Sequence, residues 1–504
     1  MGVSKFIAGA LLVGSTGLAQ TVPPGPAGSG ARAHDALLLD SMGRLVTVPT
    51  NQVANPALLP SNGMERQIPM PNKGASTPPE IQERKKAGRE GLEEIQFFPS
   101  VQPPMMPYLA SQDEFGNTVA RHGALFPYMP VEPLVQGAKY GLSDQGLRYS
   151  LKQTVTCATM TDVMKGDNTL AFYTFDLQAK WAVFDSPASG AAGWISTQIE
   201  AKTGLGTAGQ TQDARRNLGS FTDPTGIWSS VDGFRIPELA WQQSLRDGEL
   251  VIVGGMISQG NYLDANAYAG SGRGQFINSG LIDTMVVPQA DYNFGLNVQW
   301  QPTENWYGTL GGSVGNGHAG YPPWTDFSWD NWSLVAEIGY IAPDFLGLGP
   351  GIYRIQPFVG QPSGASAQLG FGLDLQQQLG HDSPFGWFGR FGTGGRERLQ
   401  TGQEQPNAGS QIGTGFVMHA PLKNLGLLPR LSNDLLGTGF VWSHLTESAE
   451  PIYHNDEYVF ETFYTLQLSP LMRFQPDFQA VWNPAHNPNP GPALVAQVQL
   501  ILSW

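Results

Sequence analysis

The stretch Leu494-Val-Ala-Gln-Val-Gln-Leu-Ile-Leu-Ser-Trp504, at the end of the sequence, decides the fold class. Side chains on a β-strand point alternately to opposite faces. One face of this strand carries Leu494, Ala496, Val498, Leu500, Leu502 and Trp504, and the other carries Val495, Gln497, Gln499, Ile501 and Ser503. In a soluble sandwich the apolar face would pack into a core, whereas in a membrane-spanning barrel it would contact lipid and the amides would face water.

The two segments before this strand divide their faces in the same way. Tyr458 to Leu468 and Met472 to Trp482 both alternate apolar and polar residues, and Ser469-Pro470 forms a turn between them. Tyr458, Trp482 and Trp504 lie at the ends of their strands, where the aromatic girdle residues of membrane barrels lie. This placement favours the barrel over the sandwich.

The composition excludes several classes of function. Charged residues make up only 14% of the chain, which contains 63 glycines and 13 tryptophans and carries a net charge of -14. Binding to nucleic acid requires clustered Lys and Arg, so we expect no nucleic-acid partner. Cys157 is the single cysteine, and the eight histidines do not have the spacing of a catalytic metal motif. The sequence therefore predicts no enzyme, no metal and no cofactor.

The N-terminal part differs in character from the rest. Lys5, the apolar run from Phe6 to Val13 and the small residues Gly17-Leu18-Ala19 predict a signal peptide over residues 1–19. Residues 20–132 are rich in Pro and Gly and without strand periodicity, which predicts a largely disordered periplasmic extension. The charged interval Pro79 to Gln96 could form a short helix, and a spacer or cell-wall contact is the alternative role of the extension.

From about Pro133 onward the chain consists of a short helical lead-in followed by strands. Strand-like runs are expected near residues 146–156, 169–184, 190–203, 233–245, 249–259, 291–301, 305–314, 332–341, 351–360, 367–379, 385–392, 410–419 and 436–445. With the last three, they predict an all-β fold, a transmembrane β-barrel of about 16 antiparallel strands over residues 133–504. After Lys202 the only lysine is Lys423, which is typical of a lipid-facing wall around a wet interior.

Three ordered blocks of sequence resemble the OprB-type carbohydrate-selective porins. The first is Glu461-Thr-Phe-Tyr with Leu468-Ser-Pro-Leu, Phe474-Gln-Pro-Asp-Phe-Gln and Asn483-Pro. The second is Tyr262-Leu-Asp-Ala-Asn-Ala-Tyr-Ala with Gln275-Phe-Ile-Asn-Ser, and the third is Trp300-Gln-Pro-Thr-Glu-Asn-Trp-Tyr ending at Gly315-Asn. The resemblance extends from about Pro133 to Trp504 and implies an outer-membrane sugar channel.

The resemblance first implicates the strand that begins at Gly233. Arg235 and Glu238 are similar to the Arg-x-x-Glu strand of the family, which implies that both line the pore. A spacing of three places them on opposite faces of a regular strand, so both would point inward only if a β-bulge occurred at Pro237. The alternative is an ion pair at the rim.

A second group of candidates lies in the glycine-rich block after the following strand. Asp264, Asn266 and Arg273 would surround the channel if this block folded back into the barrel, and a surface loop is the alternative. Further candidates are charged residues on expected inward faces: Asp374, Arg390, Glu461, Arg473 and Asp477. Opposed acids and bases across a lumen order water and favour polar, neutral solutes.

The sequence thus predicts an outer-membrane porin of a Gram-negative bacterium for passive diffusion of monosaccharides or small oligosaccharides into the periplasm. Its expected partners are outer-membrane lipids and small neutral carbohydrates, and the barrel could be a monomer or a homo-oligomer. The alternative is a secreted β-rich protein that binds carbohydrate or serves a structural role at the surface.

Overall fold

The computed structural model describes residues 35–39, 45–49, 123–186, 189–205, 213–226, 233–270, 272–290, 292–315, 327–361, 366–381, 383–394, 408–446, 451–489 and 491–504. The chain divides into two compact units, residues 1–67 and 68–504. The predicted signal peptide and the charged interval 79–96 lie outside the described residues.

The described residues of the first unit form a pair of antiparallel strands. β1 (Asp35–Leu39) pairs with β2 (Leu45–Pro49), with Asp35 opposite Pro49 and Leu39 opposite Leu45. Analysis of the sequence did not anticipate these strands, because five-residue strands are too short to show a clear period within a Pro-rich segment.

The described residues of the second unit contain four helices and sixteen strands. The helices are α5 (Glu132–Asp144), α6 (Ala214–Leu218), α7 (Ser279–Ile282) and α8 (Pro421–Asn424), with 3₁₀ turns η2 (Arg246–Gly248) and η3 (Gln259–Asn261). The first eight strands are β3 (Leu147–Met160), β4 (Thr169–Ser186), β5 (Ala191–Gly204), β6 (Gly233–Leu245), β7 (Leu250–Ile257), β8 (Asn293–Trp300), β9 (Trp306–Val314) and β10 (Trp332–Ala342). The others are β11 (Gly351–Gln361), β12 (Gln368–Gln378), β13 (Phe385–Thr393), β14 (Ser410–His419), β15 (Leu435–His444), β16 (Asp456–Ser469), β17 (Met472–Trp482) and β18 (Ala493–Ser503). Among the described residues, no helix has both the length and the apolar character needed to cross a membrane.

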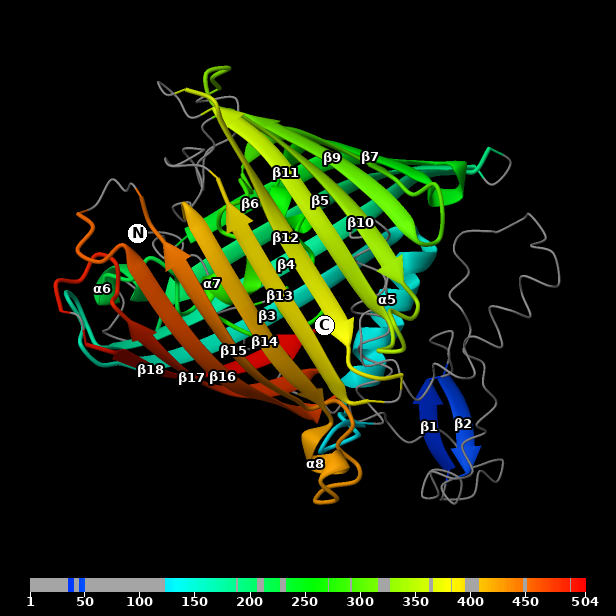
Figure 1. Cartoon of the computed structure of the whole chain (residues 1–504). Helices are drawn as coiled ribbons and strands as arrows, with labels where there is room; N and C mark the ends of the chain where they lie inside the picture. The colour runs from blue at the N-terminus through cyan, green and yellow to red at the C-terminus, as the bar shows by residue number, and fades with distance from the viewer. Residues whose placement is uncertain are drawn as a thin grey trace, which may run out of the picture. The chain divides into compact units, whose positions relative to one another are not determined.

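The sixteen strands form one closed antiparallel barrel (Figure 1). Each strand pairs with its neighbours in sequence, and β18 pairs with β3 to close the sheet, with Ser503 opposite Lys152 and Val495 opposite Met160. Closure leaves no unpaired strand edge in the barrel wall. The predicted fold class and strand number are therefore confirmed, and Gly233–Leu245 and Ser410–His419 match their predicted bounds at both ends.

The two ends of the barrel differ in their connections. At one end, here called the short-turn end, strands are joined by 187–190, 246–249, 301–305, 343–350, 379–384, 420–434 and 470–471. At the opposite, long-loop end, they are joined by 161–168, 205–232, 258–292, 315–331, 362–367, 394–409, 445–455 and 483–492. Membrane barrels have this asymmetry, with short periplasmic turns and longer extracellular loops. Helix α5 and Trp504 lie at the short-turn end.

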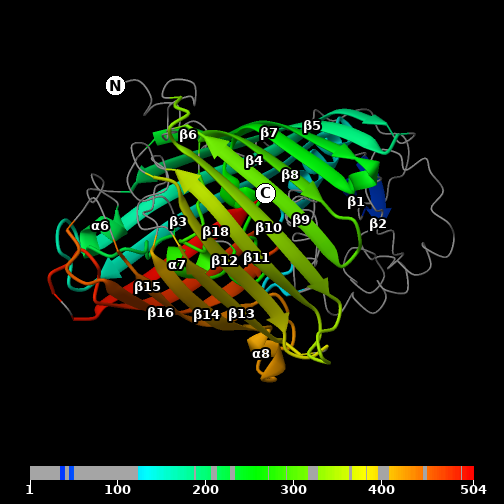
Figure 2. The same cartoon turned by 45° about the horizontal axis from the view of Figure 1, so that its top comes forward.

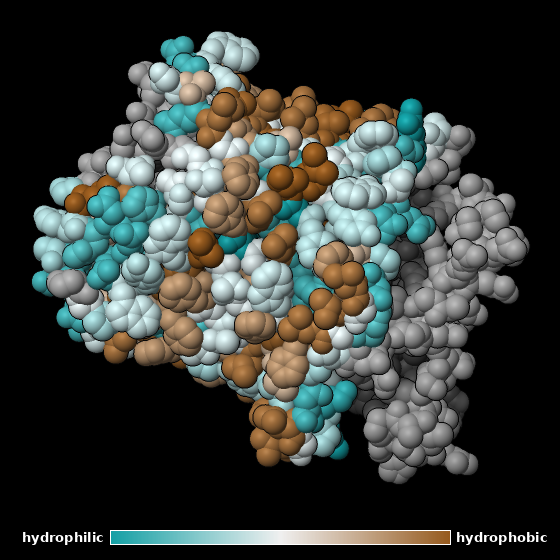
Figure 3. Space-filling view, viewed as in Figure 1, coloured by the Kyte–Doolittle hydropathy of each residue, from teal (hydrophilic) through white to brown (hydrophobic). Residues whose placement is uncertain are grey.

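The outer surface of the wall is apolar, and the inward positions are mostly polar. Large hydrophobic side chains on alternate strand positions are exposed, including Trp300 (51%), Leu296 (53%) and Leu310 (49%). Figure 3 shows such side chains spread over the strands of the visible face. The neighbouring positions carry buried polar groups such as Asn297 and Thr309. This is the reverse of a soluble protein, and it agrees with the predicted division of faces.

Aromatic side chains mark both rims of the apolar wall. Trp442 and Trp482 both lie opposite Tyr458 at the long-loop end. At the short-turn end, the rings of Trp306 and Tyr340 lie 4.7 Å apart between centroids. Their amphipathic rings suit the level of the lipid headgroups.

Some inward glycines leave room for rings from the neighbouring strand, as at Gly339, which lies opposite Tyr307. A Cβ atom at Gly339 would overlap the ring of Tyr307, whose hydroxyl is fixed by Glu337 and Arg354.

We therefore expect Gly339→Ala to lower the free energy of unfolding by about 1–3 kcal/mol, the usual cost of overpacking. Chemical denaturation of the folded barrel would measure this. The matched control is Gly308→Ala, because the nearest atom to a Cβ at Gly308 is 3.9 Å away. Equal stability of the two variants would contradict the prediction.

Candidate functional site

The connection between β7 and β8, residues 258–292 and here called the inner loop, folds back into the barrel. Figures 1 and 2 both show α7, which belongs to this loop, enclosed by the strands. Wall side chains hold its main chain: Glu461 accepts hydrogen bonds from the backbone N–H groups of Ile277 (2.5 Å) and Asn278 (2.9 Å). Gln411 likewise accepts from Met285 N (2.6 Å). The candidate site is the interior that this loop subdivides.

Asp264 anchors the first part of the inner loop. Its carboxylate accepts hydrogen bonds from Thr284 N (2.6 Å), Thr284 Oγ1 (2.9 Å) and Gln289 Nε2 (3.1 Å). Its own N–H donates to Glu337 Oε2 on β10 at 3.0 Å. Asp264 has a φ of +60°, a conformation that few non-glycine residues adopt, and these contacts hold it there.

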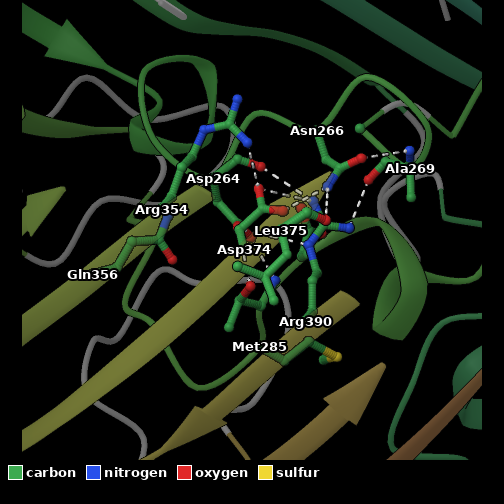
Figure 4. Close-up of polar contacts among 12 residues, drawn as sticks. Asp264, Asn266, Ala269, Met285, Arg354, Gln356, Asp374, Leu375 and Arg390 are labelled. Atoms are coloured by element: carbon green, nitrogen blue, oxygen red, sulfur yellow. Dashed lines mark hydrogen bonds and ion pairs between the residues drawn. The ribbon is translucent and has the colours of Figure 1, made fainter. Parts of the chain in front are cut away.

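Asn266 connects the same part of the loop to β12. Its Nδ2 donates to Asp374 Oδ1 (2.5 Å), and its Oδ1 accepts from the N–H groups of Tyr268 (3.0 Å) and Ala269 (3.3 Å). The carboxylate of Asp374 also accepts a hydrogen bond from Arg354 NH1 at 3.3 Å. Figure 4 shows these side chains converging from the loop and from the wall.

Arg390 on β13 is a fully buried cation at the centre of this network. Its guanidinium donates to the carbonyl oxygens of Ala269 (2.6 Å), Leu281 and Asp264 (3.2 Å). It also lies 3.6 Å from Asp264 Oδ1 and 3.9 Å from Asp374 Oδ2. One side chain of the wall therefore binds three separate points of the inner loop (Figure 4).

Arg273 and Arg473 lie away from this network. Arg273 NH1 forms an ion pair with Asp176 Oδ2 on β4 at 2.9 Å. Arg473 on β17 donates from Nε to Gln467 Oε1 at 2.9 Å. The inner loop thus brings Asp264 and Asn266 to one part of the wall and Arg273 to another.

Arg235 and Glu238 both face the interior, although their spacing is three. The pairing of β5 with β6 shifts register between Gln198 and Glu200: Gln198 lies opposite Glu238 and Glu200 lies opposite Arg235. Both side chains are buried, as is Pro237 between them. This extra residue on β6 is the β-bulge that a spacing of three requires if both side chains are to point inward. Arg235 Nε contacts Glu200 Oε2 at 3.1 Å, and Glu238 accepts from Tyr262 Oη at 2.7 Å.

A second infolded segment, residues 213–226, was not expected from the sequence. Glu457 on β16 accepts hydrogen bonds from Phe221 N (2.6 Å) and Thr222 N (2.9 Å), and the segment's Pro224 carbonyl accepts from Gln479 and Gln497. The same two glutamines donate to Asp477 Oδ1, each at 3.0 Å. Asp477 therefore orients the amides that hold this segment.

The two infolded pieces are joined to each other. Asp223 N donates to Ser279 Oγ (2.8 Å), and Ser279 N donates to the Asp223 carbonyl (2.9 Å). The carboxylate of Asp223 accepts from Thr225 N and Oγ1, both at 2.8 Å. Burial raises the pKa of Asp223 above its ordinary value, and the nearby Asp213 carboxylate raises it further.

This raised pKa predicts a pH dependence of segment 213–226. The folded state holds the Asp223 proton more tightly than the unfolded state, so docking is strongest below the ordinary aspartate pKa of about 3.9. The stabilisation is lost as pH rises from there through the raised pKa. We expect amide hydrogen exchange of 213–226, corrected for intrinsic rates, to show less protection at neutral than at acidic pH. Asp223→Asn should weaken this dependence, while the exposed control Asp330→Asn should retain it in full; protection that rises with pH would contradict the prediction.

Part of the interior is apolar, in addition to the amides and charged residues expected on the inward faces. Phe276 of the inner loop packs against Phe388 and Phe463, with ring centroids 5.2 and 4.8 Å apart. A Cβ at the inward Gly439 would lie 2.8 Å from Phe276, so glycine there makes room for the loop. Phe463 and Val459, two apolar residues on the mostly polar inward face of β16, were the signal in the sequence.

Other interior residues were missed although they obey the same alternation. Arg354 and Glu337 are buried on β11 and β10, and Arg354 Nε lies 3.9 Å from Glu337 Oε1. Tyr307 Oη donates to Glu337 and accepts from Arg354, both at 2.8 Å. Counting alternate positions from the strand ends identifies all three. Among the described residues, no group of three His, Cys, Asp or Glu side chains is arranged to hold a metal ion.

Comparison with known proteins agrees with this architecture. The model of the family described as carbohydrate-selective porin, OprB family, matches residues 360–502. This match confirms the resemblance over β12–β18; the blocks that begin at Tyr262 and Trp300 lie outside the matched residues. No curated protein matches the chain at a significant level.

Solved structures include similar barrels. The high-pH structure of Pseudomonas putida OprB has a TM-score of 0.57 and 16% identity, and the match covers 73% of this chain and 96% of that one. A mutant of the Rh. blastica porin has a TM-score of 0.44 and 9% identity, covering 71% of this chain and 100% of that one. At such identities the first likeness supports the fold alone.

Proposed function

We propose that this chain, with the OprB family pattern in residues 360–502, is an outer-membrane porin for the passive diffusion of monosaccharides or small oligosaccharides into the periplasm. The observation that carries the proposal is the combination of a closed sixteen-strand wall, apolar on its outside, with charged and amide side chains on its inside. The wall suits lipid, and the interior suits hydroxyl-rich solutes. In this proposal residues 1–19 direct export, and residues 20–132 form an extension in the periplasm.

We assign the selection of solutes to the inward polar residues. The proposed set is Arg235, Glu238, Asp264, Asn266, Arg273, Asp374, Arg390, Glu461, Arg473 and Asp477. Their carboxylates, amides and guanidinium groups offer the donors and acceptors that sugar hydroxyls require. Support comes from their burial or partial burial on the inner side and from the inner loop that several of them fix. Loop-anchoring residues such as Arg390 would act by setting the shape of the passage.

The test is conductance through a planar bilayer together with swelling of liposomes. We expect discrete conductance steps, a current reduced by added glucose, and swelling rates that fall from monosaccharides to larger oligosaccharides. Folded protein without channel activity would refute the proposal. A mature protein that stays soluble without detergent and binds sugar would instead favour the secreted, carbohydrate-binding alternative.

A further inference from the structure

Two basic side chains lie directly opposite each other on the inner wall. Arg148 of β3 pairs in register with Lys180 of β4. Cβ atoms of directly opposed residues in antiparallel strands are about 4.5–5.5 Å apart, and like charges in this position repel. The pair therefore gains stability from any anion that lies between the two groups.

The acids of the same wall already bind other partners. Asp176 pairs with Arg273 at 2.9 Å, and Glu200 pairs with Arg235 at 3.1 Å. Glu238 attracts Lys180 at longer range, but its oxygens accept hydrogen bonds from Tyr262 and Asn261. In the part of the chain that the structure describes, Arg148, Lys152 and Lys180 form no ion pair.

The inner face of β3–β6 thus carries an excess of positive charge. Together with Arg273 and with Asp223, whose carboxylate interacts with Lys202, it has six cations, Arg148, Lys152, Lys180, Lys202, Arg235 and Arg273, and four acids, Asp176, Glu200, Glu238 and Asp223, a difference of +2. The whole chain has a net charge of -14, so this sector is opposite in sign to the protein as a whole. Local charge of this kind attracts counter-ions into a cleft.

These side chains are also among the less enclosed groups of the interior. Arg148, Lys152 and Lys180 are partly exposed, whereas Arg354 and Arg390 on the opposite wall are buried. Gln178, the inward residue next to Lys180 on β4, is partly exposed as well. Lys180 Nζ donates to Gln242 Oε1 at 2.8 Å, which orients the ammonium group and leaves further N–H donors available. The pair lies close to the short-turn end, because β3 begins at Leu147.

We propose that Arg148 and Lys180 form a binding site for the oxyanion group of a small solute, a phosphate or a carboxylate, with Gln178 and Lys152 as neighbouring donors. The planar guanidinium suits two-point binding of such a group, and the ammonium adds a point charge. This inference rests on the proposed channel in that the solute reaches the site through the interior. It goes beyond that function because acidic sugars and inorganic anions would be retained where neutral sugars are not.

The experiment measures block of the channel by inorganic phosphate in a planar bilayer. We expect phosphate to reduce the chloride current of the wild-type protein and the reversal potential in asymmetric KCl to indicate preference for chloride. In Arg148→Gln and Lys180→Gln, loss of one charged hydrogen-bond donor should raise the half-blocking concentration about tenfold. Lys423→Gln, which removes an exposed positive charge at the same end, is the matched control and should leave the block unchanged.

Different solutes identify the chemical group that is bound. Glucuronate should block in the same site-dependent way as phosphate, whereas any effect of glucose should be the same in wild type and Arg148→Gln. Equal block of the wild type and of the double variant by phosphate would overturn the site while leaving the sugar channel intact. If no channel forms, the proposed function fails, and equilibrium dialysis of phosphate against folded protein in detergent still tests the site: equal binding by wild type and double variant would reject it.

Discussion

An arginine in place of Leu310 is expected to lower the free energy of unfolding by about 2–4 kcal/mol, the cost of a charged side chain near the bilayer midplane on a barrel's outer face. Leu310 lies halfway along β9, is 49% exposed and is paired with Val298 of β8. In a lipid environment the guanidinium would lose its hydration without gaining a partner. Reversible denaturation of the barrel in phospholipid bilayers measures the change.

Glu304→Arg is the matched control for this substitution. It introduces the same residue into the turn 301–305 of the same hairpin, where the side chain is exposed at the rim. The midplane cost falls to about 0–1 kcal/mol near the interface, so we expect little loss of stability. If Leu310→Arg were as stable as Glu304→Arg, the outer face of β9 would have to contact water or protein rather than lipid.

Replacement of Arg390 by methionine is expected to have the second large effect. The variant removes three hydrogen bonds to the inner-loop backbone and leaves the buried Asp264 and Asp374 with one cation fewer. Breaking a buried ion pair by removing one partner costs about 3–5 kcal/mol. We expect the inner loop to detach locally, with faster hydrogen exchange in residues 264–284 and noisier single-channel currents.

The control for Arg390 is an exposed ion pair. Arg246→Gln removes a contact of 3.6 Å with Glu249 in which the arginine side chain is 71% exposed. Exposed pairs contribute about 0–1 kcal/mol, so exchange in the inner loop should not change. Unaltered exchange and current noise in folded Arg390→Met would show that the other wall contacts suffice to hold the loop.

Local pattern was enough to predict the barrel. Each strand pairs with its neighbour in sequence, so the alternation of residues and the turns between them determine most of the wall. The seam of β18 with β3 follows from closure. Leu494, Val498 and Leu500 are exposed on the face predicted for them, and Gln497 and Gln499 are buried on the opposite face.

The partners within the interior could not be predicted in the same way. Asn266 is hydrogen-bonded to Asp374, which is 108 residues away in the sequence. Asn278 is hydrogen-bonded to Glu461, which is 183 residues away. Such contacts depend on how a long connection folds into an enclosed space, which no strand period encodes. The glycine-rich block from Asp264 to Arg273 pointed to an infolded loop, whereas the second piece at 213–226 has no strand alternation and belongs to none of the blocks that resemble the porin family.

The pairing of β18 with β3 has a consequence for biogenesis. Ser503 must find Lys152, far away along the chain, whereas every other strand pair joins near neighbours. Pairings of long sequence separation form slowly, and until this one forms, both end strands expose free backbone groups. Pairing of neighbouring strands into hairpins would therefore be fast, and closure of the barrel would be slow. A chain truncated before Ala493 could not close and would persist as an open, aggregation-prone sheet.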